Sequence, residues 1–362
     1  MKILILTTGK TGSTALAYAL KEQLADHKLY FEPANLDLTE EESKNCIVKF
    51  LKIHQWKQNK HFFDNFDQKI LLVRHPFDQL ISYSLYAPFD GNGFSNDVFA
   101  LEYFNLLKAK RKNPKKVCFL DIIDCFCKIT ERNIDNFLNH FSSVYKSFID
   151  CFESDYNFHL VKYEDFIDEN LRELEHQLNV KINSQIQVAT QFSRVKRSSK
   201  YGDWQTWFTK RDVDFFNPYY FNSLEKFSYS NNFESSGKKN ISREQSLDYY
   251  LKLVNQYRNR NFLPDFNQSQ ILLSNEGLYF DRALSLYNNG SKLDALDVLE
   301  KAIQLNSKIA GFHILKGRIL SEEKLLKKSI KSFNQAFLID PDTRLRLQER
   351  PWFKKITQEA MS

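Results

Sequence analysis

The chain begins with a short apolar run, a glycine-rich turn and a helical pattern, in that order. The apolar run covers residues 2–7, and residues 9–14 read GKTGST. A short strand that is buried on both faces and leads into a helix is typical of α/β proteins. Glycines let the backbone approach a ligand closely, and the free N–H groups and dipole of a helix start favour an anion. This segment therefore predicts an anion-binding loop between a strand and a helix.

The predicted loop also carries polar side chains. Thr11, Ser13 and Thr14 add hydroxyl donors, and Lys10 adds a positive charge. A Walker A motif has four residues between its first glycine and a Gly-Lys pair, whereas Lys10 precedes the second glycine of this loop, Gly12. NTPases also need an aspartate that holds Mg²⁺ at a strand end, and neither of the next two apolar runs supplies one. A nucleotide-binding kinase or NTPase is therefore an alternative that the spacing disfavours.

Further apolar runs and helical patterns alternate along the first half of the chain. Strands are expected at residues 47–54, 69–74 and 159–162, and helices at residues 15–24, 134–152 and 169–178. This alternation predicts an α/β domain with a mainly parallel sheet flanked by helices. Functional groups should gather at the carboxyl ends of the strands, where the loop, His54 and Arg74 fall.

The last part of the chain repeats itself. Ala302 and Ala336 lie 34 residues apart in similar helical patterns, a period that is typical of tetratricopeptide repeats. Ser307 and Ser329 depart from the usual pattern of that repeat. We expect two repeats at residues 276–343, followed by a terminal capping helix.

The composition between these parts indicates where the domains end. Residues 228–240 are rich in Ser, Asn, Gly and Lys, which predicts a linker, and a helical pattern follows at residues 244–257. We therefore expect an α/β domain at residues 1–235, a linker and helix at residues 236–275, and an all-α tetratricopeptide-like region at residues 276–362.

Charge and composition narrow the class of partner. The chain has 362 residues, of which 42% are hydrophobic, as in a globular protein. The net charge of +6 suits an anionic ligand but is too small to indicate nucleic acid. No apolar run reaches the roughly 18 residues that span a bilayer, and the N-terminus does not resemble a signal peptide, so we expect a cytoplasmic protein. The five cysteines lack the spacing of metal ligands, which predicts buried thiols and no metal site.

The loop resembles the donor-binding loop of the sulfotransferases that use 3′-phosphoadenosine 5′-phosphosulfate (PAPS). The cytosolic members have Lys-Ser-Gly-Thr-Thr where this chain has Lys10-Thr11-Gly12-Ser13-Thr14. The resemblance implies that Lys10 contacts the bridging oxygen between sulfur and phosphorus, and that the other four residues hold the 5′-phosphate. Ala15 replaces the tryptophan that often follows this loop and stacks on adenine.

A second segment with the same resemblance begins at Arg74. The family binds the donor's 3′-phosphate with an Arg-x-Pro segment and a serine eight residues after the arginine, and Arg74, Pro76 and Ser82 match it. An arginine at a strand end offers a bidentate fork to a phosphate, and Pro76 suits the first turn of a helix. The resemblance implies that Arg74 and Ser82 bind the 3′-phosphate, which distinguishes PAPS from ATP. His75 is expected to orient Arg74 or to face solvent.

Further segments extend the resemblance over about the first 230 residues. Residues 197–204 are similar to the family's C-terminal segment that closes over the 3′-phosphate, and Arg197 matches its arginine. Thr190 and Phe192 resemble a Thr-x-Phe that flanks adenine, and Tyr163 matches a tyrosine near the purine. The resemblance thus adds four residues to the expected donor site.

Two residues compete for the role of catalytic base. Lys52 and His54 resemble the Lys-Thr-His of the cytosolic enzymes, in which the histidine is the base and the lysine faces the donor. Histidine suits the role because its pKa lies near neutral. Glu32, in a Phe-Glu-Pro sequence, resembles a segment of carbohydrate sulfotransferases, and a carboxylate is the base in some relatives. His54 is the preferred base; Glu32 is the alternative, and a structural contact would explain Glu32 equally well.

These resemblances imply a sulfotransferase that moves a sulfuryl group from PAPS to a hydroxyl or amine and leaves adenosine 3′,5′-bisphosphate. Such transfer depends on positioning and charge stabilisation, so it needs no metal. The Phe-Glu-Pro likeness favours a carbohydrate or glycoconjugate acceptor, while a protein acceptor, or a protein partner at the repeats, stays open. The alternatives are a kinase or NTPase, and an inactive sulfotransferase-like scaffold that binds protein partners through its repeats.

Overall fold

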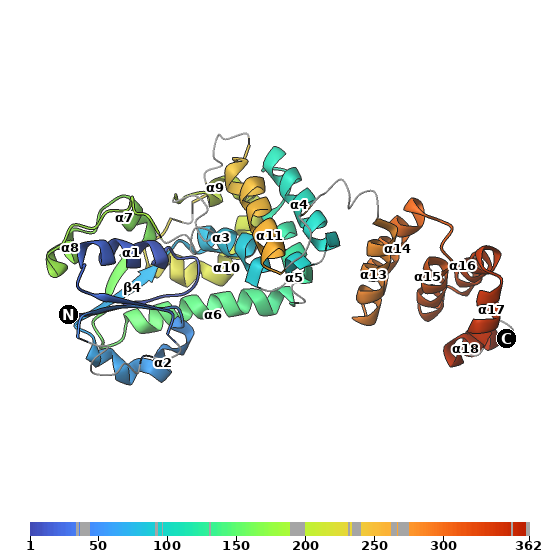
Figure 1. Cartoon of the computed structure of the whole chain (residues 1–362), viewed down its shortest axis with the longest axis horizontal. Coiled ribbons are helices and arrows are strands. Elements are labelled where there is room, and N and C mark those ends of the chain that lie inside the picture. Colours follow the sequence, from blue (N-terminus) through green and yellow to red (C-terminus); the bar gives the residue numbers. More distant parts are fainter. Residues whose placement is uncertain are drawn as a thin grey trace. The chain divides into compact units, whose positions relative to one another are not determined.

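The computed structural model of the chain contains two compact units (Figure 1). Unit 1 comprises residues 1–95 and 102–264, and unit 2 comprises residues 96–101 and 265–362. The structure describes residues 1–33, 36, 44–90, 93–95, 97–129, 132–188, 200–230, 232–233, 240–261, 266, 275–348 and 350–359. Thr190, Phe192 and Arg197, three of the expected donor-site residues, lie outside these described residues. Within them, no helix is both long and apolar enough to cross a bilayer.

Unit 1 is built on a five-stranded parallel sheet with the strand order β2-β3-β1-β4-β5. The strands are β1 Lys2–Leu6, β2 Lys28–Phe31, β3 Cys46–Phe50, β4 Gln68–Val73 and β5 His159–Lys162. The central strand β1 pairs with β3 on one side and β4 on the other, and its apolar side chains are buried. The predicted α/β fold with a parallel sheet is confirmed.

Two strands differ from the prediction. β2 was not predicted, because this edge strand begins with the exposed Lys28 and its other side chains are only half-buried, so it contains no continuous buried run. The strand expected at residues 47–54 ends earlier, at Phe50. A 3₁₀ turn, η1 Ile53–Gln55, carries His54 just beyond the strand.

Helices cover both faces of the sheet (Figure 1). α1 Ser13–Gln23, α7 Tyr163–Ile167 and α8 Arg172–Leu178 lie on one side, whereas α2 Trp56–Asn59 and α6 Ile134–Phe152 lie on the other. On the first side Ile3 and Ile5 of β1 join Leu16, Leu20 and Leu174 in one buried cluster. Burying each such side chain contributes about 1.5–3 kcal/mol, which holds α1 and α8 against the sheet.

The helix α6 coincides with the helix predicted at residues 134–152. α8 begins three residues later than predicted, because Glu169 adopts the left-handed conformation (φ 54°) and ends α7 instead. The Asn170 N–H donates to the Asp165 carbonyl at 2.8 Å across that helix end. The helix was predicted to begin at Glu169, where the backbone instead ends α7.

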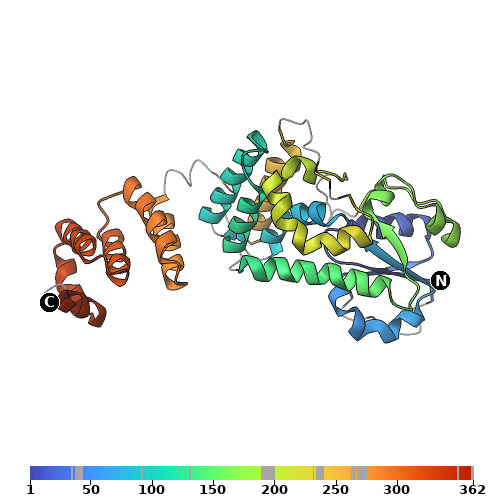
Figure 2. The same cartoon turned by 180° about the vertical axis from the view of Figure 1, so that it is seen from behind.

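Unit 1 contains further helices, of which η2 continues α2. They are η2 Lys60–Asn65, α3 Pro76–Asp90, η3 Gly93–Ser95, α4 Asp97–Lys112 (from residue 102), α5 Phe119–Ile129, α9 Trp204–Trp207, α10 Lys210–Lys226, the π-helical turn η5 Glu244–Asp248 and α11 Tyr249–Arg260. α10 runs alongside α6 (Figure 2). The helix expected between the two domains corresponds to η5 and α11, which belong to unit 1.

Unit 2 consists of helical hairpins. Its helices are α13 Asn275–Asn288, α14 Lys292–Leu305, α15 Ala310–Glu322, α16 Leu326–Ile339, α17 Asp342–Gln348 and α18 Pro351–Glu359. α13 packs on α14 and α15 packs on α16. Two short helices, rather than the single expected capping helix, follow the second hairpin, and Pro351 begins the second of them.

The two hairpins repeat with the predicted offset of 34 residues. Ala302 on α14 and Ala336 on α16 occupy equivalent positions, and both are fully buried. Gly317 allows α15 and α16 to approach closely, because a Cβ atom there would lie 2.8 Å from the Phe333 ring. Ser329, which departs from the repeat pattern, is buried and its hydroxyl donates to the Gly317 carbonyl at 2.7 Å, so the polar substitution is satisfied.

Candidate functional site

The strand order places a topological switch point between β1 and β4 at the carboxyl edge of the sheet, where open α/β sheets have their ligand-binding crevice. From β1 the chain turns toward β2 and β3, whereas from β4 it continues toward β5, so the connections of these neighbouring strands diverge. Open α/β sheets bind ligands at such a switch point. The loop at residues 7–12 follows β1, and Arg74 follows β4, so both predicted phosphate-binding segments lie at this crevice.

The loop after β1 is held by its own threonines. The Thr7 hydroxyl donates to the Leu72 carbonyl of β4 at 2.6 Å and lies 2.8 Å from the Thr11 hydroxyl. Thr11 also donates to the Thr8 carbonyl at 2.9 Å. Thr11 is fully buried, so its side chain shapes the loop, and its predicted role at the phosphate would fall to its backbone.

Backbone conformation at Lys10 and Gly12 turns the loop into α1. Both residues are left-handed, with φ of 67° and 88°, and such strain in a residue with a side chain, as at Lys10, is typical of ligand-binding loops. Gly12 is the N-cap of α1 and offers no capping side chain. The first N–H groups of α1 therefore lack a side-chain cap, as an anion-binding helix start requires. Ser13 begins α1.

Tyr163 joins the loop to the end of β4. The register pairs Val73 with Lys162, so Arg74 and Tyr163 follow directly on adjacent strands. The Arg74 guanidinium lies 4.3 Å from the centre of the Tyr163 ring. A Cβ atom at Gly12 would lie 2.3 Å from the same ring, so only glycine fits there. Three residues predicted separately from the sequence thus meet.

Arg74 is buried, with 5% of its surface exposed, and it links three stretches of backbone. Its Nη1 donates to the Lys10 carbonyl at 3.2 Å and its Nη2 to the Lys200 carbonyl at 3.3 Å. Among the described residues its Nε has no hydrogen-bond partner. A guanidinium has five N–H donors, so Arg74 retains capacity for an anion after making these two bonds. This orphaned, buried donor fits a bound phosphate.

Gln79 is a site residue that sequence reasoning missed. From α3 its Nε2 donates to the Gly9 carbonyl at 2.7 Å, which ties the loop to this helix. The Tyr145 hydroxyl of α6 contacts the Gln79 Oε1 and lies 2.8 Å from the Arg74 carbonyl. Gln79 lies five residues after Arg74 in the segment that carries the resemblance, and no signal in the sequence marked it.

The other residues predicted to bind the donor lie on α3 or contact it. Pro76 begins α3 as predicted, and Ser82 lies on its second turn but is buried. The Lys10 ammonium lies 4.2 Å from the centre of the Tyr86 ring, also on α3. α3 therefore meets the loop through the lysine that was predicted to face the leaving group.

The prediction that His75 could face solvent is wrong. It is buried and stacks on the Trp204 ring, with 5.0 Å between ring centres. The Phe77 N–H donates to His75 Nδ1 at 3.3 Å, so the proton belongs on Nε2, which lies 3.1 Å from the Ser230 carbonyl. Burial lowers the pKa of His75, so the neutral ring is favoured. The backbone N–H of His75 donates to Glu164 Oε1 at 3.0 Å, which fixes the turn that follows Arg74.

Lys49 is a second residue that sequence reasoning missed. It lies near the end of β3 with 3% of its side chain exposed, and burial lowers its pKa. Its Nζ lies 2.6 Å from Glu32 Oε1 and 3.0 Å from the Thr14 hydroxyl. The register explains the ion pair, because Phe31 pairs with Lys49 and Glu32 follows. A lysine inside a buried strand is uncommon, and this was the signal available in the sequence.

His54 and Lys52 belong to the segment after β3 that contacts the loop through Ile53. The Ile53 N–H donates to the Thr7 carbonyl at 3.2 Å, which fixes η1 against the loop. His54 is exposed, and its ring centre lies 6.4 Å from that of His140 on α6. Partial burial, followed by His140 and Lys52, lowers the pKa of His54. The Lys52 ammonium lies 6.0 Å from the centre of the Phe50 ring. The structure thus connects Glu32, through Lys49, to the loop, and pairs His54 with another histidine.

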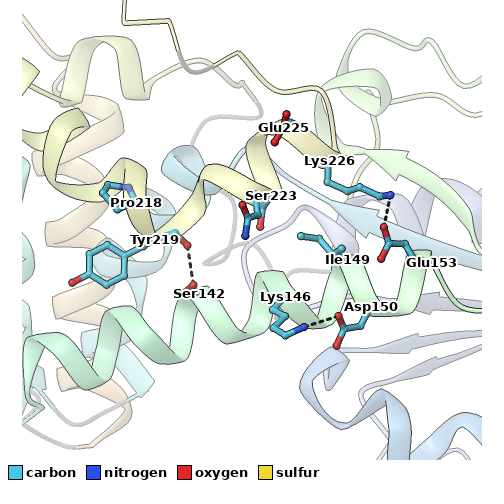
Figure 3. Close-up of a pocket in the computed structure, with 11 residues that line it drawn as sticks. Ser142, Lys146, Ile149, Asp150, Glu153, Pro218, Tyr219, Ser223, Glu225 and Lys226 are labelled. Carbon is cyan, nitrogen blue, oxygen red and sulfur yellow. Dashed lines mark hydrogen bonds and ion pairs between the residues drawn. The ribbon is translucent and has the colours of Figure 1, made fainter.

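A separate depression of about 550 Å³ lies between α6 and α10 (Figure 3). None of the predicted site residues lines it. Its two lysines are paired with carboxylates, Lys146 with Asp150 and Lys226 with Glu153, and the Ser142 hydroxyl donates to the Tyr219 carbonyl. The depression therefore offers no unpaired lysine to an anion.

The fold and the site define an α/β protein with a candidate anion-binding loop at the switch point of a parallel sheet. Comparison with known proteins adds no name to this class: no family model, no curated protein and no solved structure matches the chain. Any closer assignment depends on the residues themselves.

Proposed function

We propose that the chain is a PAPS-dependent sulfotransferase whose donor binds at the crevice between β1 and β4. The observation that carries this proposal is the meeting of Arg74, Tyr163 and Gly12. They come from three segments with the same family resemblance, and the Tyr163 ring lies against both Arg74 and Gly12. An unrelated set of similarities would not be expected to converge on one crevice.

The chemistry of the crevice supports two phosphate positions. The uncapped start of α1, with Ser13, Thr14 and Lys10, suits the 5′-phosphate. The buried guanidinium of Arg74, with Ser82 on α3, suits the 3′-phosphate. The donor would supply the sulfuryl group, and this chain would hold it by backbone amides, hydroxyls and one buried guanidinium.

In the proposed reaction an acceptor hydroxyl or amine forms a bond to sulfur while the bond from sulfur to the phosphate oxygen breaks. The acceptor proton passes to a base, and adenosine 3′,5′-bisphosphate leaves. Lys10 would stabilise the charge on the leaving phosphate. His54 is the proposed base, because its lowered pKa favours the neutral form that accepts a proton. Glu32 is the alternative base, and its ion pair with Lys49 would orient it.

The proposed acceptor is a carbohydrate or glycoconjugate, on the likeness of the Phe-Glu-Pro segment at Glu32. In unit 2 we propose two tetratricopeptide repeats that bind a protein partner. Their 34-residue offset and the close crossing at Gly317 support that class of repeat.

Turnover with a panel of glycans tests the proposed function. The full chain is incubated with PAPS in the presence of a metal chelator, and sulfated products and adenosine 3′,5′-bisphosphate are identified by mass spectrometry. The expected result is formation of both in equal amounts with at least one glycan. ATP turnover that requires Mg²⁺, with no use of PAPS, would instead establish the kinase or NTPase alternative.

A further inference from the structure

Asp78 is a fully buried carboxylate that joins two segments of the candidate site. It lies on α3, between Arg74 and Ser82 in the sequence. One of its oxygens accepts the Gly202 N–H at 2.5 Å, and the other accepts the Trp204 N–H at 2.9 Å. Hydrogen bonds from backbone N–H groups to a buried carboxylate are charge-assisted and strong. Asp78 therefore fixes the backbone at the start of α9.

The turn that Asp78 fixes reaches back to Arg74. Gly202 has a φ of 76°, which glycine adopts without strain. Two residues earlier, the Lys200 carbonyl accepts a hydrogen bond from Arg74 Nη2 at 3.3 Å. The orientation of the Arg74 guanidinium thus depends on the turn at residues 200–204. Asp78 attaches this turn to α3, the helix that follows Arg74 in the sequence.

Asp78 does not suit direct contact with a phosphate. Its charge would repel an anion, and each of its oxygens already accepts a backbone N–H. Any effect of Asp78 on a bound anion must therefore act through the turn at residues 200–204 and through Arg74.

We propose that Asp78 is a positioning residue for the 3′-phosphate of the donor. It holds the turn at residues 200–204 so that the Lys200 carbonyl orients Arg74 toward the crevice. This inference rests on the proposed function and deepens it. It assigns selectivity for a 3′-phosphate to Asp78, a residue that does not itself contact the donor.

The test compares two nucleotides in the full-length wild type and in Asp78→Asn. Adenosine 3′,5′-bisphosphate and AMP differ only in the 3′-phosphate. The dissociation constant of AMP divided by that of the bisphosphate therefore isolates the contribution of that group. In the variant an NH₂ donor replaces one acceptor and faces a backbone N–H, which loosens the turn. Binding of the bisphosphate should weaken about tenfold, while AMP binding stays unchanged. Equal weakening of both nucleotides, or no change in either, would overturn the proposal.

Asp212→Asn is the matched control. Asp212 is also fully buried, and its oxygens accept the Phe119 and Leu120 N–H groups at 2.9 Å each, at the start of α5. Its hydrogen-bond partners include none of the predicted donor residues. This variant should lose stability and keep the wild-type ratio of dissociation constants. A fall in the ratio as large as that of Asp78→Asn would mean that general loosening causes it, and would overturn the proposal.

Tyr201→Phe carries the test if Asp78→Asn does not fold. The Tyr201 hydroxyl donates to Asp168 at 2.5 Å and anchors the outer side of the same turn, and Tyr201 is exposed. The ratio should fall about threefold, and an unchanged ratio would overturn the proposal. A wild type that binds both nucleotides equally would instead remove the proposed function. The failure of the two ideas is therefore distinguishable.

Discussion

Arg74 shows at the scale of one residue how the site combines structural and binding roles. A buried charge is costly unless it is compensated. Two backbone carbonyls, from Lys10 and Lys200, and the face of the Tyr163 ring compensate it in part. An anion against the remaining N–H groups would complete this compensation. In the proposed function the same guanidinium would both link these backbone segments and attract the donor.

Substitutions at the two basic residues of the crevice should separate binding from catalysis. Arg74→Ala should raise the KM for PAPS about 100-fold with a smaller fall in kcat, because it removes a contact that exists before the reaction. Lys10→Ala should lower kcat by about 10²–10³ with little change in KM, because charge on the leaving group develops during transfer. Steady-state kinetics checks both. Arg74→Lys, which keeps the charge but not the fork, should resemble Arg74→Ala; wild-type KM in that variant would contradict the account.

The pH dependence of turnover should report the neighbours of His54. A base works in its neutral form, so kcat should be lost as the pH falls through the pKa of His54, which lies below the ordinary 6.5. Burial is the main cause and His140 the next. His140→Gln removes the second cause, so the acid limb of the profile should move to higher pH. A limb that stays in place or moves to lower pH would contradict this role.

Substitutions at His54 and Glu32 should show which of the two residues is the base. His54→Gln should lower kcat about 10²–10⁴-fold, the usual contribution of a general base, without changing donor affinity. Glu32→Gln should have a smaller effect, through the loss of its ion pair with Lys49. Unchanged kcat in His54→Gln together with a large loss in Glu32→Gln would assign the base to Glu32.

At the scale of elements, β1, the loop and α1 form one unit whose geometry depends on Gly12. The Gly12→Ala substitution would place a methyl group 2.3 Å from the Tyr163 ring and would force an alanine to a φ of 88°. Left-handed strain costs about 1–2 kcal/mol, and overpacking adds about 1–3 kcal/mol. Chemical denaturation should therefore show a loss of about 2–5 kcal/mol. Gly9→Ala is the control, with nothing within 4 Å of its Cβ atom, and should change stability by less than about 0.5 kcal/mol.

Elements with long, periodic or continuously apolar sequences could be predicted, and residues placed by tertiary contact could not. α6 coincides with the predicted residues 134–152, and β5 coincides with the predicted residues 159–162, although only Val161 of that strand is fully buried. Lys49 was missed because a buried lysine makes sense only once its ion pair with Glu32, directly after the neighbouring strand β2, is known. Gln79 was missed because its acceptor, the Gly9 carbonyl, is 70 residues away in the sequence. His54 was placed on a strand because local pattern does not reveal where β3 leaves the sheet.

At the scale of the whole molecule, the chain joins an α/β unit to a unit of helical hairpins. Each has its own buried clusters, around Ile5 and Leu174 in unit 1 and around Ala302 and Phe312 in unit 2. Separate cores allow separate unfolding. The proposed donor site lies in unit 1, so a nucleotide bound there should shift the unfolding transition of unit 1, whereas a substitution in the core of unit 2 should shift the other transition.

Calorimetry of the full chain should show two unfolding transitions. Gly317→Ala would place a methyl group 2.8 Å from the Phe333 ring and should lower only the transition of unit 2. Gly311→Ala, whose nearest neighbour is 4.0 Å away, is the matched control and should change little. Adenosine 3′,5′-bisphosphate should raise only the other transition. One transition that responds to both the ligand and Gly317→Ala would contradict the separation of the two units.

The crevice between β1 and β4 is proposed to hold a nucleotide with phosphates at both the 5′ and 3′ positions. Isothermal titration of the full chain with adenosine 3′,5′-bisphosphate, AMP and ATP tests it most directly, with and without Mg²⁺. The bisphosphate should bind at least about tenfold more tightly than AMP or ATP, independently of Mg²⁺. Equal affinities for the three nucleotides, or a Mg²⁺-dependent preference for ATP, would contradict it.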